Sequence, residues 1–190
     1  MSEYVIAARE FGRRAHTGQR DKADREYFEG HLVPIASAAQ VFGPNVVAAA
    51  WLHDVLEDTA ATAEDLARAG IPAHVIAGVE SVTRRSGETY SELIQRACAD
   101  SVGRFVKLVD NAWNITANPN LVRVDPARAA SLLKRRYEPA RQELLAACGL
   151  DLAAPAVLEM QRVLDTYMAR SRGRFSGGSV DALQMRREAT

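Results

Sequence analysis

Residues 51–59 read Trp-Leu-His-Asp-Val-Leu-Glu-Asp-Thr, and this stretch does most to decide the fold and the function. The apolar residues 46–52 predict a helix that faces a core, and we expect this central helix to span residues 45–58. Four ionisable side chains at the end of such a helix lose hydration on burial, which is unfavourable unless a partner compensates for it. A divalent metal ion is the simplest such partner, so the stretch predicts a metal site.

Helical spacing arranges the four side chains in two pairs. Residues three and four positions apart share one face of a helix, which puts His53 beside Glu57 and Asp54 beside Asp58. The adjacent His53 and Asp54 diverge by about 100° on a helix. They can bind one ion only if it lies over the helix flank, and further ligands must come from other segments.

Two other segments offer such ligands. His31 stands at the start of the apolar run 31–36, and Asp110 ends the apolar run 104–110. Two imidazoles and two carboxylates favour Mn²⁺ or Fe²⁺, with Zn²⁺ and Co²⁺ as alternatives. Four protein ligands on an ion that can take six leave positions for water and substrate, which is the condition for metal-assisted hydrolysis.

Several segments resemble one known family. They are Ala-His-Thr-Gly-Gln at 15–19, Asp-Lys-Ala-Asp-Arg-Glu-Tyr-Phe at 21–28, His-Leu-Val-Pro-Ile-Ala at 31–36, Leu-His-Asp-Val-Leu-Glu-Asp-Thr at 52–59, Gly-Val-Glu-Ser-Val-Thr-Arg-Arg at 78–85 and Val-Lys-Leu-Val-Asp-Asn-Ala-Trp-Asn at 106–114. In this order they resemble the HD phosphohydrolase superfamily, and most closely the hydrolase domain of the Rel/Spo alarmone enzymes and their small single-domain relatives.

This resemblance implies an all-α fold, a single HD-domain helical bundle with one Mn²⁺, and removal of the 3′-pyrophosphate from guanosine tetra- or pentaphosphate. The implied metal ligands are His31, His53, Asp54 and Asp110. Glu57 and Asp58 would position and deprotonate the attacking water. Lys22, Tyr27 and Asn114 would lie against the nucleotide.

The chain also departs from the family pattern. Asp21 replaces a basic residue, Leu32 and not Pro follows His31, the stretch from Tyr27 to His31 is one residue longer than usual, and Trp113 stands where the family often has His. Most of these changes concern the substrate pocket. They keep open a second hypothesis, an HD phosphohydrolase acting on another nucleotide or phosphorylated metabolite. A third hypothesis is a non-catalytic nucleotide-binding sensor, against which the retained acidic pair argues.

Composition sets the remaining expectations. The 190 residues carry 24 basic and 24 acidic side chains, and this zero net charge argues against a dedicated nucleic-acid binder. Charges scattered through residues 1–20 argue against a signal peptide, and no apolar stretch is long enough for a membrane span. Cys98 and Cys148 lack metal-binding spacing and are expected to be reduced thiols. We expect a cytoplasmic monomer or homodimer that binds a nucleotide and neither nucleic acid nor membrane.

The rest of the chain predicts further helices. We expect them at 3–16, 33–42, 63–69, 72–84, 89–99, 126–147 and 154–170, with loops at 17–30 and 116–124. One more helix is expected to follow Gly103 and to end near Asn114. The expected organisation is an HD domain over 1–150, a C-terminal helical extension over 151–170 that packs on the domain or forms a dimer contact, and a disordered tail over 171–190. His16 is interpreted as structural, and Arg20, Arg25, Arg84 and Arg85 are possible phosphate contacts. The basic run 134–136 is interpreted as a solvated helix face.

Overall fold

The computed structural model describes residues 2–21 and 24–176, and within these ranges the regular structure is helical. Arg20 and Glu26 form an isolated antiparallel bridge, and no strand occurs in the described ranges. The α-helices are α1 (Glu3–Ala15), α2 (Val33–Ala38), α3 (Pro44–Leu52), α4 (Val55–Asp58), α5 (Ala63–Arg68), α6 (Ala73–Val82), α7 (Tyr90–Ala99), α8 (Gly103–Val122), α9 (Pro126–Leu132), α10 (Glu138–Ala147) and α11 (Pro155–Ser176). Two π-helical segments are η1 (Phe28–Leu32) and η3 (Leu133–Tyr137), and η2 (Ala39–Phe42) is a 3-10 helix.

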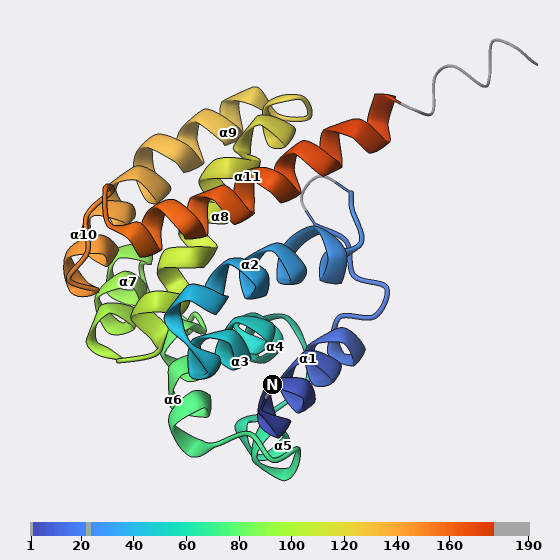
Figure 1. Ribbon diagram of the computed structural model, residues 1–190, viewed down its shortest axis with the longest axis vertical. Coiled ribbons are helices and arrows are strands. Elements are labelled where there is room, and N and C mark those ends of the chain that lie inside the picture. The colour runs from blue at the N-terminus through green and yellow to red at the C-terminus, as the bar shows by residue number, and fades with distance from the viewer. Residues whose placement is uncertain (1, 22–23, 177–190) are drawn as a thin grey trace, which may run out of the picture.

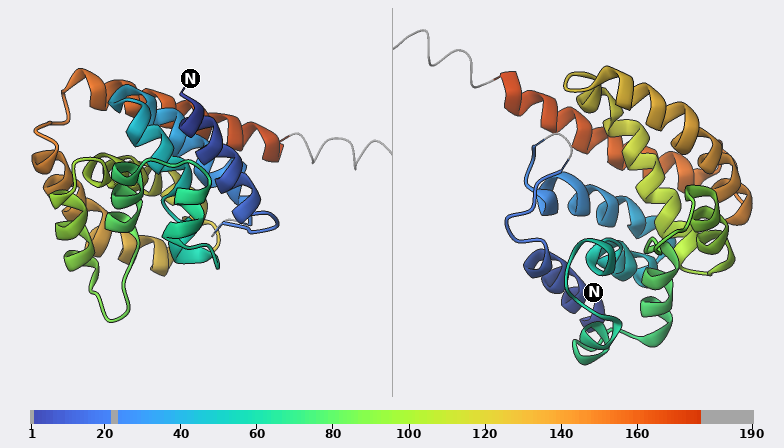
Figure 2. Two further views of the ribbon diagram at one scale, coloured as in Figure 1. Left: turned by 90° about the horizontal axis from the view of Figure 1, so that it is seen from below. Right: turned by 180° about the vertical axis from the view of Figure 1, so that it is seen from behind.

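The helices form a bundle around α3 and α8 (Figures 1 and 2). On one side, α1 packs against α3 so closely that a Cβ atom on Gly12 would lie 2.3 Å from the Trp51 carbonyl oxygen. On the other side, α11 crosses α2 and α8 (Figure 1). The elements that carry the predicted metal ligands, η1, the α3–α4 junction and α8, therefore meet in the middle of the bundle.

Local sequence signals explain where several helices begin. The Thr62 side chain accepts a hydrogen bond from the Asp65 N–H, and the Asp65 carboxylate accepts one from the Thr62 N–H. This reciprocal pair is a capping box. Thr89 and Glu92 form the same arrangement at α7. The Asp125 side chain caps α9, directly before Pro126 in the first helical turn.

The predicted central helix 45–58 is wrong in one respect, because it breaks at His53 and Asp54. The Nδ1–H of His53 donates to the Ala50 carbonyl oxygen at 2.9 Å. In a continuous helix that carbonyl bonds to the N–H four residues later, so the imidazole competes with the helical hydrogen bond. Asp54 takes φ −102° and ψ −3°, and α4 begins after it.

The predicted loop at 116–124 is also wrong, because α8 continues through Pro119 to Val122. Proline removes one helical hydrogen bond, and tertiary contacts must compensate for this loss. Such contacts come from α11: Gln161 Nε2 donates to Thr116 Oγ1 at 2.8 Å, and Asn120 Nδ2 contacts Met168 Sδ at 3.4 Å.

Both π-helical segments come directly before an α-helix that has proline in its first turn. Pro34 follows η1 and Pro139 follows η3. A proline has no N–H to donate to the carbonyl four residues earlier. The preceding N–H groups bond five residues back instead, Val33 to the Phe28 carbonyl and Glu138 to the Leu133 carbonyl. The predicted helix 126–147 is thus interrupted by a wider turn at 133–137.

The C-terminal helix packs on the preceding helices. Met160 and Leu164 of α11 are fully buried in the same apolar core as Leu52 of α3 and Leu108 of α8. The Ser37 and Tyr167 hydroxyls lie 2.9 Å apart across the contact with α2. Of the two roles considered for this helix, the structure shows the packing contact. The predicted tail from residue 171 begins inside α11, and its part beyond Ser176 lies outside the described residues.

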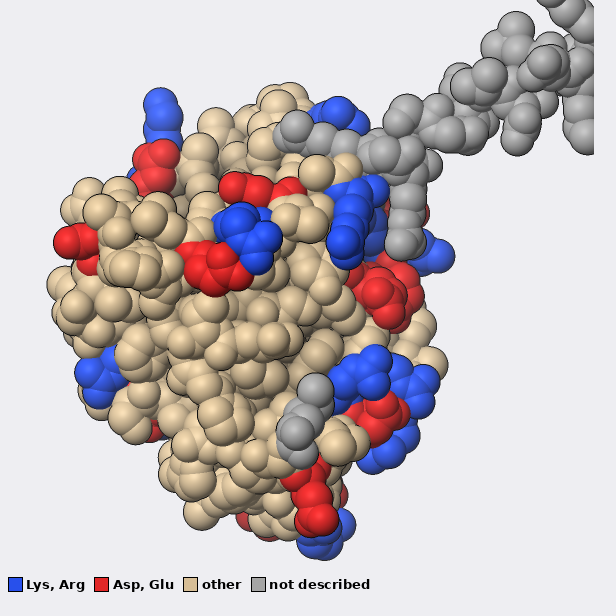
Figure 3. Space-filling model, viewed as in Figure 1, with Lys and Arg blue, Asp and Glu red and all other residues tan. Residues whose placement is uncertain are grey.

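Charges are mixed on the surface. On the face in Figure 3, acidic and basic side chains lie interspersed around the margin, in keeping with the zero net charge. None of the helices in the described ranges has both the length and the apolar character needed to cross a bilayer.

Candidate metal centre

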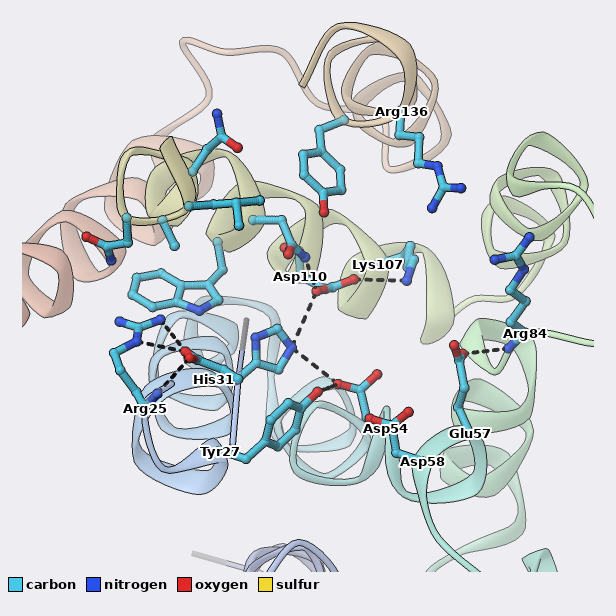
Figure 4. A pocket seen from close by; sticks show the side chains of 18 of the residues that line it. Arg25, Tyr27, His31, Asp54, Glu57, Asp58, Arg84, Lys107, Asp110 and Arg136 are labelled. Carbon is cyan, nitrogen blue, oxygen red and sulfur yellow. Dashed lines mark hydrogen bonds and ion pairs between the residues drawn. The ribbon is translucent and has the colours of Figure 1, made fainter. Parts of the chain in front are cut away.

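The predicted ligands lie at a pocket of about 400 Å³. Its walls come from the segment before α2, the α3–α4 junction, the α6–α7 loop, α8 and η3 (Figure 4). The pocket therefore joins segments that are more than 100 residues apart in sequence, from Gln19 to Tyr137.

Three side chains converge closely. His53 Nε2 lies 3.0 Å from Asp54 Oδ2 and 3.3 Å from His31 Nε2, and His31 Nε2 lies 3.2 Å from Asp54 Oδ2. His53 is 2% exposed, whereas the other two are partly buried. The break between α3 and α4 lets adjacent residues meet in this way, so the predicted divergence on a continuous helix does not apply.

The orientation of His53 suits a metal ligand. Because a carbonyl oxygen can only accept, the 2.9 Å bond to Ala50 requires the proton on Nδ1. Nε2, the nitrogen that faces the cluster, is then the one that can offer its lone pair to an ion that displaces its proton. A backbone carbonyl that fixes the tautomer in this manner is a common feature of metal-binding histidines.

Asp110 stands on the fourth side of the cluster. Its Oδ1 lies 3.8 Å from His31 Nε2 and 4.0 Å from His53 Nε2. Its other oxygen accepts from Lys107 Nζ at 2.9 Å, and Asn114 Nδ2 donates to Oδ1 at 2.6 Å. Asn114, predicted to lie against a nucleotide, therefore lines the pocket but is also bonded to a predicted metal ligand.

Burial and charge act in opposite directions on these groups. Burial raises the pKa of Asp54, but the imidazoles of His53 and His31 hold that pKa well below its ordinary value. Burial likewise raises the pKa of Asp110, and Lys107 and His53 lower it overall. Burial lowers the pKa of His53, yet Asp54 and Asp110 raise it to about 9. The two carboxylates are thus charged and depend on nearby positive charge.

These residues fit a divalent ion. Neighbouring ligands of a six-coordinate ion with bonds of about 2.1 Å lie roughly 3 Å apart, and the three shortest separations are 3.0, 3.2 and 3.3 Å. Within the described residues, His31, His53 and Asp54 are the group whose donor atoms meet this closely. They could hold a metal ion, with Asp110 as a further carboxylate on the open side.

Tyr27 lies beneath the cluster. Its hydroxyl donates a short hydrogen bond to Asp54 Oδ2, and its ring packs between His16 and His31 with centroid distances of 4.9 Å to each. Burial and the Asp54 carboxylate raise the pKa of Tyr27 above its ordinary value, so the hydroxyl remains a donor. Tyr27 was predicted to contact substrate. It lines the pocket, but its hydroxyl is bonded to a predicted ligand.

Glu57 and Asp58 lie at the pocket rim and are exposed. Asp58 Oδ2 accepts from Gln19 Nε2 at 2.9 Å, and Gln19 Oε1 in turn contacts His16 Nδ1 at 2.6 Å. Glu57 Oε2 accepts from the backbone N–H of Arg84 at 2.8 Å (Figure 4). His16 is 1% exposed, in agreement with the structural role expected for it.

Several residues at the pocket differ in their contacts from what the sequence suggested. Arg136, interpreted as part of a solvated face, lines the pocket with its guanidinium 5.5 Å from the Tyr90 ring centroid. The π-turn of η3 sets this direction, and a helical pattern could not reveal it. Asp21 binds Arg25 at 2.6 Å, and Arg25 lies over the Trp113 ring. Lys22, a predicted substrate contact, lies outside the described residues.

Comparison with solved structures supports the fold. The chain superposes on a structure described as a metazoan ortholog of SpoT that hydrolyses ppGpp and plays a role in starvation responses, with a TM-score of 0.62 and 21% sequence identity over 91% of this chain and 97% of the other. The two proteins therefore share an all-helical fold. The all-α HD-domain prediction is therefore confirmed. No family model and no curated protein matches the sequence.

The π-helical segment η1 covers most of the stretch from Tyr27 to His31, whose sequence is one residue longer than in the family that the chain resembles. A π-turn contains one residue more than an α-turn, and η1 spans this stretch. In this wider turn, His31 Nε2 lies 3.3 Å from His53 Nε2.

Proposed function

We propose that this protein is a Mn²⁺-dependent hydrolase that removes the 3′-pyrophosphate from guanosine 3′,5′-bis(diphosphate), ppGpp. The observation that carries the proposal is the convergence of His31, His53, Asp54 and Asp110 beside an exposed acidic pair in one pocket. The HD-domain fold shared with a ppGpp-hydrolysing protein supports the choice of substrate.

The two histidines and two aspartates would hold the ion. A divalent ion at this position lowers the pKa of water and polarises a phosphoryl oxygen. The donor set of two imidazoles and two carboxylates agrees with Mn²⁺, and Fe²⁺, Co²⁺ or Zn²⁺ would suit the same ligands.

The proposed step is an attack by water on the phosphorus attached to the ribose 3′-oxygen. A new bond forms between the water oxygen and that phosphorus, the bond from phosphorus to the 3′-oxygen breaks, and the products are GDP and pyrophosphate. Glu57 or Asp58 receives the proton of the water, since both carboxylates are open to solvent at the rim. The 3′-oxygen takes up a proton as it leaves.

Cationic side chains would hold the phosphates. Lys107, Arg84 and Arg136 line one side of the pocket, and Figure 4 shows them on walls that face the same space. Charge-assisted hydrogen bonds from such groups would stabilise the charge that develops on the pyrophosphoryl group while water attacks it. Lys22 is retained in the proposal as a further contact, while Tyr27 and Asn114 would act from the pocket wall.

One observation favours a second candidate substrate class. Asp21, which replaces a basic residue of the family pattern, is bonded to Arg25 through Nε at 2.7 Å and through Nη2 at 2.6 Å. The pair neutralises itself at the pocket wall beside Trp113. A pocket altered there would suit another nucleotide or phosphorylated metabolite with the same hydrolytic chemistry.

The test is pyrophosphate release from ppGpp by the purified full chain with Mn²⁺. Asp54→Asn keeps the shape of the side chain but removes a charged ligand, and it should abolish release. Glu159→Gln, an exposed acid that pairs only with Arg162 among the described residues, serves as the matched control. Activity on other nucleotides but not on ppGpp would favour the second class, and tight ppGpp binding without product would favour a sensor.

A further inference from the structure

The α6–α7 loop, residues 83–89, reaches the acidic pair at the pocket rim. Its Arg84 N–H donates to Glu57 Oε2 at 2.8 Å, the one hydrogen bond that this carboxylate accepts within the described residues. Glu57 is exposed, so without this bond its side chain would sample several rotamers. The position of the loop therefore decides where the Glu57 carboxylate stands.

Arg96 of α7 holds this loop from the outside. Its guanidinium donates to the carbonyl oxygens of Glu80 and Thr83, each at 2.7 Å. It also binds both oxygens of Glu88, at 2.8 Å through Nε and at 2.7 Å through Nη2. The side chains of Arg96 and Glu88 are 17% and 10% exposed. One side chain thus joins the end of α6, the start of the loop and its far end.

Glu88 in turn accepts hydrogen bonds from Arg84 and Arg85 and so connects Arg96 to the start of the loop. Its Oε2 accepts from the Arg85 N–H at 2.9 Å, and its carbonyl oxygen accepts from Arg84 Nη2 at 3.2 Å and Nε at 3.3 Å. The hydrogen bond from Arg96 lowers the pKa of Glu88 to about 2, so the pair stays ionised at neutral pH. Hydrogen bonds from Arg84 and Arg85 to Glu88 therefore join the two ends of the loop. The Arg84 N–H is left to donate to Glu57.

We propose that Arg96 is a positioning residue for the hydrolysis: it fixes the α6–α7 loop so that the Arg84 N–H holds the Glu57 carboxylate in one place at the pocket rim. Arg96 is not one of the described residues that line the pocket, and so it acts only through the loop. The inference rests on the proposed function, in which Glu57 is one of the two carboxylates that receive the proton of the attacking water.

A pair of variants at Arg84 isolates the hydrogen bond. Arg84→Ala removes the guanidinium and keeps the N–H, whereas Arg84→Pro removes both. Thr83 has φ −74° and ψ 125°, the extended conformation that a following proline requires. We expect kcat of the proline variant to be roughly tenfold to a hundredfold below that of the alanine variant, with similar KM, because a misplaced base affects the chemical step. Equal kcat values would overturn the proposal.

Variants at Arg96 test whether this side chain, which does not line the described part of the pocket, affects the rate through the loop. Arg96→Met should lower kcat and leave KM nearly unchanged, and Arg96→Lys should restore part of the rate because it keeps one charged donor. Arg162→Met, an arginine in an exposed pair, should behave as the wild type. A loss in Arg96→Met that falls on KM alone would contradict a positioning role.

Amide hydrogen exchange gives a readout that needs no activity. In the metal-free full chain, the Arg84 amide should exchange roughly tenfold faster in Glu57→Ala and in Arg96→Met than in the wild type. The first variant removes the acceptor of the Arg84 N–H, and the second removes the side chain that holds the loop in place. Unchanged exchange would overturn the proposal. A wild-type protein that releases no pyrophosphate yet shows this exchange pattern would refute the proposed function and leave the loop contact established.

Discussion

Replacing Lys107 by methionine should reveal the charge balance of the candidate metal centre. Lys107 Nζ lies 2.9 Å from Asp110 Oδ2, and the two side chains are 12% and 9% exposed. Removing one partner of a buried pair destabilises a protein by about 3–5 kcal/mol, because the remaining charge has lost both water and counterion. Asp110 keeps the Asn114 amide at 2.6 Å, so we expect the lower end, about 3 kcal/mol.

The assay is thermal unfolding followed by circular dichroism, with and without Mn²⁺. For a protein of this size, 1 kcal/mol corresponds to about 2–4 °C, so Tm of the metal-free variant should fall by roughly 6–12 °C. Lys134→Met on the exposed part of η3 is the matched control and should change stability by less than about 0.5 kcal/mol. With Mn²⁺ bound, the ion supplies positive charge to Asp110, and the loss should be smaller.

Two results would refute this reasoning. An equal fall in the Tm of Lys107→Met with and without Mn²⁺ would mean that the ion and Lys107 do not neutralise the same carboxylate. A Tm of Lys107→Met that matches the Lys134→Met control would mean that the Asp110 charge is not buried as the structure has it.

Three further predictions follow from the same structure. Mn²⁺ at about 100 times its Kd should stabilise the wild type by about 2.7 kcal/mol in thermal melts, and His53→Ala should lose this gain. Gly12→Ala should cost about 1–3 kcal/mol in urea unfolding, because its Cβ would meet the Trp51 carbonyl oxygen at 2.3 Å. The pKa of Glu88 is about 2 in the folded protein against an ordinary 4.5, so its stabilising effect is complete above the ordinary value and is lost as pH falls toward 2. Unfolding free energies measured across this window should fall less steeply in Glu88→Gln than in the wild type.

The sequence sufficed for the helical fold because that depends on local pattern, whereas the grouping of the four candidate metal ligands came from polar residues in apolar runs together with a family resemblance. Apolar periodicity and capping residues such as Thr62 and Asp125 mark most helices. The two His and two Asp are rare in apolar runs, so their burial alone indicates a shared partner. Their grouping was predicted, whereas their roles as ligands remain a proposal.

Three features could not be predicted from the sequence: the helix break after Leu52, the continuation of α8 through Pro119 and the direction of Arg136. The first two depend on competition between local and tertiary hydrogen bonds. The break after Leu52 requires that the His53 imidazole bind the Ala50 carbonyl, and no spacing rule predicts that bond. The continuation of α8 through Pro119 depends on contacts with α11, which is distant in sequence. The direction of Arg136 depends on a π-turn, which a 3.6-residue period cannot represent.

Burial separates the four polar residues of the central stretch into two kinds. His53 is 2% exposed and Asp54 is partly buried, whereas Glu57 and Asp58 are exposed. A metal ligand needs a fixed geometry that packing supplies, and a proton acceptor needs contact with water. The break in the helix produces this division, because it turns the first pair into the bundle and leaves α4 to carry the second pair at the rim. The exposed pair then requires separate supports, which the Arg84 N–H provides for Glu57 and Gln19 provides for Asp58.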